Sequence, residues 1–341
     1  MGLNGSSHSD SVSGSVYKTR MTVGLFQKRA MRWVVLGLLV WGVSAFLAVR
    51  LFPLQIRTSM ENYRAWRLGL ISVNAEKLHG QSLGLGPRCL ILVHGIGDTN
   101  ATWHRLMPKL KEALEPDWRV LAWELPGHGR SARPAPTAEG TAELRPRLMA
   151  ERLRRAAREA GCDGKSLWVG NSLGGWVAAW VGVLFPDEVQ GLVLLSPAGL
   201  ESQARHPKMP SPAGLLENPT VESIQEFRAR AFAKKQEEYP QWVWQAALER
   251  IRSSSVRRTR AAVTPEDTLD ASLGKINAPT IVIWGKQDRI LPLEASQDFR
   301  RVAPESISSF REVDDCGHLP QKECPESVVT AVKDILRFGT F

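Results

Sequence analysis

Short apolar runs alternate with amphipathic helical stretches along the chain from about residue 71. The runs cover residues 89–93, 119–123, 166–170, 191–195, 280–284 and 307–313. Helical candidates lie between them, at residues 102–114, 143–160, 173–184, 293–302 and 325–338. Strands that are buried on both faces appear as continuous apolar runs. This alternation therefore predicts an α/β fold, with a mostly parallel sheet and helices on both of its faces.

One interval breaks this rhythm, because residues 196–279 are far longer than a single crossover needs. Residues 200–272 have helical periodicity, few strand signals and many Arg, Lys and Glu side chains. They predict an inserted helical cap over the carboxyl edge of the sheet. Residues 68–199 and 273–341 are then the two parts of one core.

The N-terminal region contains an uncharged apolar segment at residues 33–49, preceded by Lys28, Arg29 and Arg32. It predicts a single transmembrane anchor over residues 33–52, after a disordered basic tail at residues 1–32. A cleaved secretory signal is the alternative, because the segment is short for a membrane span. The positive charges on its two sides are too evenly balanced to choose an orientation.

Composition excludes several other classes of protein. The net charge of +9 suggests a polyanion partner, but the basic residues are interleaved with Glu, so we expect no nucleic-acid partner. The four cysteines are scattered and form no CxxC pair, which indicates neither a metal site nor a disulfide scaffold. The cysteines therefore do not indicate whether the chain resides in an oxidising or a reducing compartment.

The segment Gly170-Asn171-Ser172-Leu173-Gly174 follows a predicted strand and opens a predicted helix. This is the context of a G-x-S-x-G nucleophile elbow, in which a tight turn exposes the serine hydroxyl above the sheet. Ser172 is therefore the predicted nucleophile.

A predicted strand also runs into His94-Gly95-Ile96-Gly97, where an oxyanion-hole loop belongs. Acyl transfer needs two backbone N–H groups directed at the developing oxyanion. We assign them to Ile96 and to Leu173, the residue after the nucleophile.

A serine nucleophile needs a base and an acid that orients the base. In this elbow fold the chain order is serine, acid, histidine, which selects Asp288 after the strand at 280–284 and His318 after the last strand. Asp314 and Asp315 are rival acids, but residues so near His318 in sequence are poorly placed to reach its ring. His128, in a turn of Gly and Pro before the serine, is assigned a structural role.

The motifs HGIG, ELPGHGRS, GNSLGG, WGKQD and DCGH, in this order, resemble the α/β-hydrolase superfamily over roughly residues 70–341. The LLSPAGL and WGKQD stretches and the anchor resemble membrane-bound monoacylglycerol lipases and bacterial lipases and esterases. The GNSLGG elbow also resembles the meta-cleavage-product hydrolases, which break carbon–carbon bonds with the same triad. Glu124 stands where the family usually has Asp, which alters a turn hydrogen bond and no catalytic residue.

These observations predict a membrane-anchored carboxylic-ester hydrolase that acts on a small-molecule or lipid ester through an acyl-enzyme, without metal or cofactor. Carbon–carbon hydrolysis is the alternative chemistry, and a non-catalytic binding protein is the alternative class. The cap is expected to admit one acyl chain, so that monoacylglycerols are better substrates than triacylglycerols. The cap aromatics either line that channel or form the cap's own core; they are Phe227, Phe232, Tyr239, Trp242 and Trp244. Acyl length and oligomeric state stay open.

Overall fold

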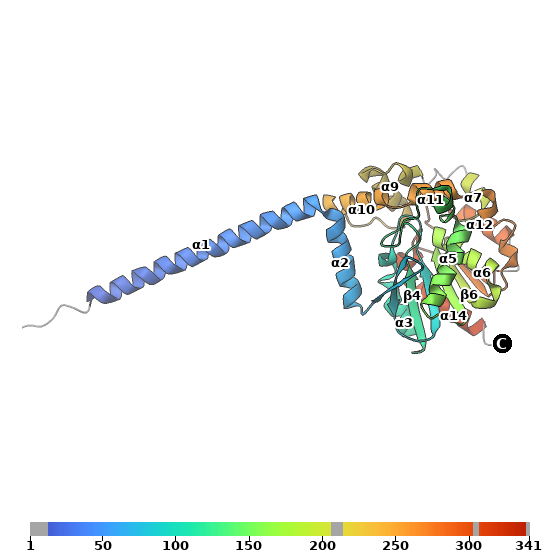
Figure 1. The fold of residues 1–341 in the computed structure, drawn as a ribbon, viewed down its shortest axis with the longest axis horizontal. Coiled ribbons are helices and arrows are strands. Elements are labelled where there is room, and N and C mark those ends of the chain that lie inside the picture. Colours follow the sequence, from blue (N-terminus) through green and yellow to red (C-terminus); the bar gives the residue numbers. More distant parts are fainter. Residues whose placement is uncertain (1–12, 206–213, 303–306, 339–341) are drawn as a thin grey trace, which may run out of the picture. The chain divides into compact units, whose positions relative to one another are not determined.

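The computed structural model describes residues 13–205, 214–302 and 307–338. It divides into two compact units, Met1–Ile56 and Arg57–Phe341, which are described separately. The first unit consists mainly of one continuous helix, α1 (Ser13–Leu51), labelled in Figure 1. A second helix, α2 (Pro53–Arg67), starts two residues after α1 ends.

Helix α1 includes part of the segment that the sequence assigns to a disordered tail. The tail was expected over residues 1–32, whereas the helix begins at Ser13, and residues 1–12 lie outside the described part of the chain. Residues 13–32 contain no proline, so nothing in them interrupts a helix that continues into the apolar segment. Within the described residues, the stretch Met31–Leu51 alone is long and apolar enough to cross a membrane, a test that a signal sequence also passes.

The second unit is built on an eight-stranded sheet with the order β1-β2-β4-β3-β5-β6-β7-β8. Strands β1 and β2, and strands β2 and β4, pair antiparallel, and all other pairs are parallel. The strands are β1 (Ile71–Ala75), β2 (Leu78–Leu83), β3 (Arg88–Val93), β4 (Trp118–Trp123), β5 (Ser166–Asn171), β6 (Val189–Leu195), β7 (Thr280–Gly285) and β8 (Ser309–Val313). The prediction of a mostly parallel sheet is confirmed.

Sequence reasoning located six of these strands to within about two residues and did not place β1 and β2. Strand β1 is largely exposed, and β2 buries the polar side chains of His79, Gln81 and Ser82. Neither strand therefore shows the apolar run on which the prediction depended.

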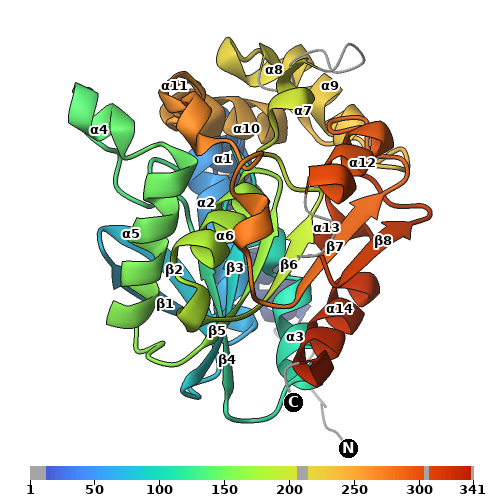
Figure 2. The same cartoon turned by 90° about the vertical axis from the view of Figure 1, so that its right-hand side faces the viewer.

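Helices cover both faces of the sheet, because successive side chains of the central strands point to opposite faces. In β3, Ile91 and Val93 pack with α5 (Pro146–Glu159), α6 (Leu173–Leu184) and α12 (Leu293–Val302). Leu90 and Leu92 pack with α3 (Leu106–Ala113) and α14 (Pro325–Phe338) on the other face. Figure 2 shows the two helical layers on either side of the sheet.

Five helices follow β6 and lie over the carboxyl ends of the parallel strands (Figure 2). They are α7 (Glu201–Arg205), α8 (Gly214–Glu217), α9 (Val221–Ala231), α10 (Gln241–Ser253) and α11 (Val256–Ala262). Helices α8 to α11 share a small core of their own, with Ile224, Trp244 and Leu248. The described residues of the interval assigned to the cap form helices and loops and no strand, while the domain boundaries at residues 68, 200 and 273 stay predictions. The remaining short helices are α4 (Ala138–Ala142) and α13 (Pro320–Glu323).

All four cysteines form disulfides, which the sequence did not indicate. Cys89, in β3, pairs with Cys162 across 73 residues of chain. Cys316 pairs with Cys324 across 8 residues, in the segment between β8 and α14. Only the folded chain brings Cys89 and Cys162 together, because β3 lies beside the segment that follows α5.

Candidate functional site

Ser172 occupies the turn between β5 and α6, with φ 55° and ψ −117°, a backbone conformation that is costly for any residue with a Cβ. Glycines at positions 170 and 174 allow the backbone segments around this turn to approach one another closely. A Cβ on Gly170 would lie 2.1 Å from the carbonyl oxygen of Gly174, and a Cβ on Gly174 would lie 2.1 Å from that of Val93. The sequence spacing thus gives the sharp strand–turn–helix expected of a nucleophile elbow.

His318 and Asp288 are joined by a hydrogen bond between Nδ1 and Oδ2 of 2.7 Å, and both side chains are buried. The second carboxylate oxygen of Asp288 accepts from the backbone N–H groups of Ile290 and Leu291, each at 2.9 Å. Both oxygens of Asp288 are therefore engaged, and the carboxylate is fixed. With Nδ1–H donating to Asp288, the Nε2 lone pair of His318 is left to accept a proton.

The rival acids Asp314 and Asp315 face elsewhere. Asp314 forms an ion pair with Lys286 at 3.0 Å, and Asp315 forms one with Lys234 at 3.4 Å. Their side chains are 82% and 76% exposed, so neither is held against the His318 ring.

The backbone of His318 is held on both sides. Its N–H donates to the carbonyl of Ala231 at 2.7 Å, and its carbonyl accepts from Nδ2 of Asn171 at 2.9 Å. Asn171 precedes the serine and so ties the elbow directly to the histidine loop. The sequence placed Asn171 in the elbow but gave it no role, because its partner is 147 residues away.

The predicted oxyanion loop lies against the elbow. A Cβ on Gly95 would meet the Cβ of Ser172 at 3.3 Å, so the backbone at residues 95–96 passes beside the predicted nucleophile. Leu173 is the first residue of α6, where backbone N–H groups have no acceptor within the helix. The structure thus brings the backbone of Ile96 and Leu173 close to Ser172.

His94 holds this loop in place. Its Nε2 accepts from the backbone N–H of Leu125 at 3.1 Å, which requires the proton to be on Nδ1, and Nδ1 lies 2.7 Å from the carbonyl oxygen of Gly95. Burial lowers the pKa of His94, which keeps the ring neutral. His128 is also buried, with its pKa lowered to about 3 by burial, in keeping with the structural role assigned to it.

Glu124 lies beneath the same loop. Its carboxylate accepts from the backbone N–H groups of Arg130 at 2.6 Å and Asn100 at 3.4 Å. Burial raises its pKa, although these hydrogen bonds oppose the shift.

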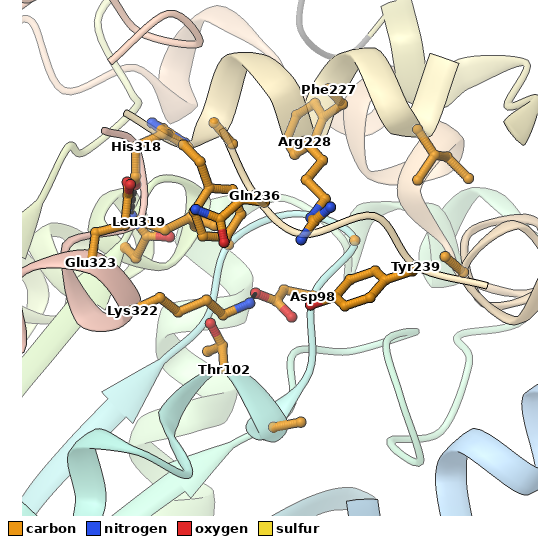
Figure 3. Close-up of a pocket in the computed structure, with 18 of the residues that line it drawn as sticks. Asp98, Thr102, Phe227, Arg228, Gln236, Tyr239, His318, Leu319, Lys322 and Glu323 are labelled. Carbon is orange, nitrogen blue, oxygen red and sulfur yellow. Dashed lines mark hydrogen bonds and ion pairs between the residues drawn. The ribbon is translucent and has the colours of Figure 1, made fainter. Parts of the chain in front are cut away.

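Ser172 and His318 line a cavity of about 760 Å³ between the sheet edge and the cap. Its apolar wall comes largely from cap side chains, including four of the five cap aromatics: Phe227, Phe232, Tyr239 and Trp244. The guanidinium of Arg228 lies 4.2 Å from the ring centre of Tyr239. Figure 3 shows Phe227, Arg228 and Tyr239 in the wall of the cavity.

Two groups in the cavity wall escaped sequence reasoning. Asp98 and Lys322 approach to 3.5 Å beside the predicted oxyanion loop. Figure 3 shows the two side chains pointing toward one another. Burial alone would raise the pKa of Asp98, but Lys322, His94 and local hydrogen bonds outweigh it and lower the pKa to about 2. Helix α2 also contributes lining, with Arg57, Glu61 and Arg64. No motif marks these residues, because their positions depend on how distant segments pack.

Within residues 13–205, 214–302 and 307–338, no three His, Cys, Asp or Glu side chains are grouped to hold a metal ion. The expectation that the reaction needs neither metal nor cofactor stays a prediction.

Comparison with known proteins identifies the family. A model described as the alpha/beta hydrolase family matches residues 90–331. The chain is 26% identical over 271 residues to a 2-hydroxy-6-oxononadienedioate/2-hydroxy-6-oxononatrienedioate hydrolase from Klebsiella pneumoniae, covering 76% of this chain and 91% of that one. It is 27% identical over 252 residues to Lipase 3 from a Moraxella species, covering 72% and 74% of the two chains.

Among solved structures, a bacterial membrane phospholipase A aligns with a TM-score of 0.68 and 25% identity, covering 90% of this chain and 99% of that one. Together with the family match over residues 90–331, the strand order and the helical layers, this places the fold. The chain belongs to the alpha/beta hydrolase family and has its fold.

Proposed function

We propose that this hydrolase cleaves carboxylic esters through an acyl-enzyme on Ser172. The observation that carries the proposal is the 2.7 Å hydrogen bond from His318 to Asp288, in a cavity that Ser172 also lines. This bond selects the tautomer in which Nε2 of His318 is a base. The Asp288 carboxylate orients the ring and stabilises the imidazolium that forms.

The reaction then follows in two halves. The Ser172 oxygen attacks the ester carbonyl while its proton passes to His318, and the N–H groups of Ile96 and Leu173 donate to the oxyanion. His318 returns the proton to the departing alcohol, which leaves an acyl group on Ser172. Water, deprotonated by His318, attacks this acyl group. The bond to the Ser172 oxygen breaks, His318 returns the proton to that oxygen, and the carboxylic acid is released.

The cavity favours an ester with a single acyl chain. Its volume of about 760 Å³ falls within the usual range for small-ligand sites, and its apolar wall suits a hydrocarbon chain. Three long chains on one glycerol would not fit together. Monoacylglycerols should therefore be turned over faster than long-chain triacylglycerols, and equal rates would contradict this argument.

Active-site labelling tests the enzyme class. A fluorophosphonate should label the wild-type protein and not Ser172→Ala, and the same variant should lose ester hydrolysis while keeping its thermal transition. A wild-type chain that is neither labelled nor active would favour a non-catalytic binding protein.

Carbon–carbon hydrolysis is the second candidate, favoured by the similarity to the Klebsiella hydrolase. A panel of acylglycerols and of dienones from aromatic ring cleavage distinguishes the two chemistries. Turnover of dienones alone would replace the ester proposal.

The membrane anchor completes the proposal. Residues 33–52 are proposed to span the bilayer, and the hydrolase unit to face an oxidising compartment, where its two disulfides persist. The full-length protein should then resist extraction by alkaline carbonate. A mature chain that starts near residue 45 would show instead that the segment is a cleaved signal.

A further inference from the structure

Helix α2 has one face that belongs to the hydrolase unit. Both carboxylate oxygens of Glu61 accept from Arg250 of cap helix α10, each at 2.9 Å, and Arg57 donates to Glu61 at 3.2 Å. Arg57 also donates to the carbonyl of Val243, in the same cap helix, at 3.3 Å. Ala65, one turn further along, is buried. The spacing of Arg57, Glu61 and Ala65 places them on one side of the helix.

A different face of α2 is apolar and uncovered. Met60, Tyr63 and Trp66 are 57%, 59% and 72% exposed, and the rings of Tyr63 and Trp66 lie 5.8 Å apart. Steps of three residues keep these side chains on adjoining parts of the helix surface. Arg67 is exposed beside them. In the described part of the hydrolase unit these three side chains stay exposed. Exposing two large aromatic rings to water is unfavourable.

We propose that the face formed by Met60, Tyr63 and Trp66 docks on the bilayer surface, and that the α2 wall of the cavity thereby opens toward the membrane. The covalent chain supports a lipid occupant. The candidate span ends at Leu51 and α2 begins at Pro53, and Met60 follows seven residues later, about 10 Å along α2 at roughly 1.5 Å per residue. The helix therefore starts where the chain leaves the membrane.

The chemistry of the face fits the same occupant. Trp and Tyr side chains concentrate at the membrane–water interface, where the ring is buried among acyl chains and the polar atom reaches water. An arginine beside them attracts anionic headgroups. Since Arg57, Glu61 and Arg64 of the same helix line the cavity, docking of α2 brings the cavity wall to the lipid surface. An ester in the membrane then reaches Ser172 without crossing bulk water, a consequence that rests on the proposed function.

A depth measurement tests the docking itself, independently of catalysis. Because all four native cysteines are in disulfides, an added cysteine can be labelled with an environment-sensitive fluorophore without reduction. Full-length Trp66→Cys and Leu85→Cys are compared in phosphatidylcholine/phosphatidylglycerol vesicles that contain brominated lipid. Leu85 is the matched control, because it is 81% exposed and lies in the loop between β2 and β3.

The label at position 66 should be strongly quenched by the brominated lipid, and the label at position 85 should not. Equal, weak quenching at the two positions would overturn the proposal, whether the face then lies in water or against a second copy of the chain.

An activity ratio tests the functional consequence. Tyr63→Ser/Trp66→Ser should hydrolyse a short-chain, water-soluble ester like the wild type and lose on the order of tenfold on vesicle-borne monoacylglycerol. Leu85→Ser should keep the wild-type ratio of the two rates. An unchanged ratio in the double variant would overturn delivery from the membrane. A wild type that hydrolyses neither ester would refute the proposed function, and the quenching result would still decide the docking.

Discussion

Replacing Ser172 by glycine should separate the backbone role of this residue from its chemical one. Ser172 has φ 55° and ψ −117°, a conformation that costs a residue with a Cβ about 1–3 kcal/mol and glycine very little. Glycine in turn loses about 0.5–1 kcal/mol more conformational entropy on folding. Ser172→Gly should therefore be more stable than Ser172→Ala by about 1 kcal/mol.

The comparison with alanine is the matched control, because both variants lack the hydroxyl and differ only in the Cβ. Ser172 lines the cavity, so we expect the loss of its Cβ to leave no enclosed void. For a chain of this size, about 1 kcal/mol corresponds to a rise in Tm of roughly 2–4 °C.

Thermal unfolding of both full-length variants in the same detergent gives the difference in Tm, and fluorophosphonate labelling should be absent from both. A glycine variant that melts at or below the alanine variant would show that the elbow stores no backbone strain. Labelling of either variant would show that another residue is the nucleophile.

Three further predictions follow from the site. Asp288→Asn and His318→Ala should each reduce kcat by at least about a thousandfold. The two losses should not add in the double variant, because the two groups act as a unit, and additive losses would contradict the triad. The Cys316–Cys324 disulfide closes the loop that carries His318, so reducing it, or replacing both cysteines by alanine, should lower kcat more than it raises KM. An unchanged kcat would show that hydrogen bonds alone hold the loop. Burial lowers the pKa values of His79, His104 and His128 to about 4, 4 and 3, so only the unfolded chain takes up their protons as the pH falls from about 6.5 toward 4. Urea unfolding should therefore give a lower free energy of unfolding at pH 5 than at pH 7, by on the order of 2 kcal/mol for each of these histidines. Equal stability at both pH values would contradict this account.

The sequence by itself determined the parallel part of the sheet and the residues of the proposed triad. Central strands are buried on both faces, so they appear as apolar runs that can be recognised in a short stretch of sequence. The elbow motif is also local in sequence, because Gly170, Ser172 and Gly174 stand within one tight turn between a predicted strand and a predicted helix. The chain order of serine, acid and histidine pointed to an acid between Ser172 and His318, and the nearness of Asp314 and Asp315 to His318 in sequence left Asp288. The structure pairs Asp288 with His318.

Tertiary structure decided what depends on distant segments. Strands β1 and β2 form by antiparallel pairing at the edge of the sheet and carry no apolar run. Asn171 reaches His318, and Asp98 reaches Lys322, across 147 and 224 residues of chain. Helix α2 became part of the cavity wall through contacts with distant segments, such as that of Glu61 with Arg250, 189 residues away. Such contacts leave no periodic signal, since each arises from the packing of two elements whose relative position the local sequence does not encode.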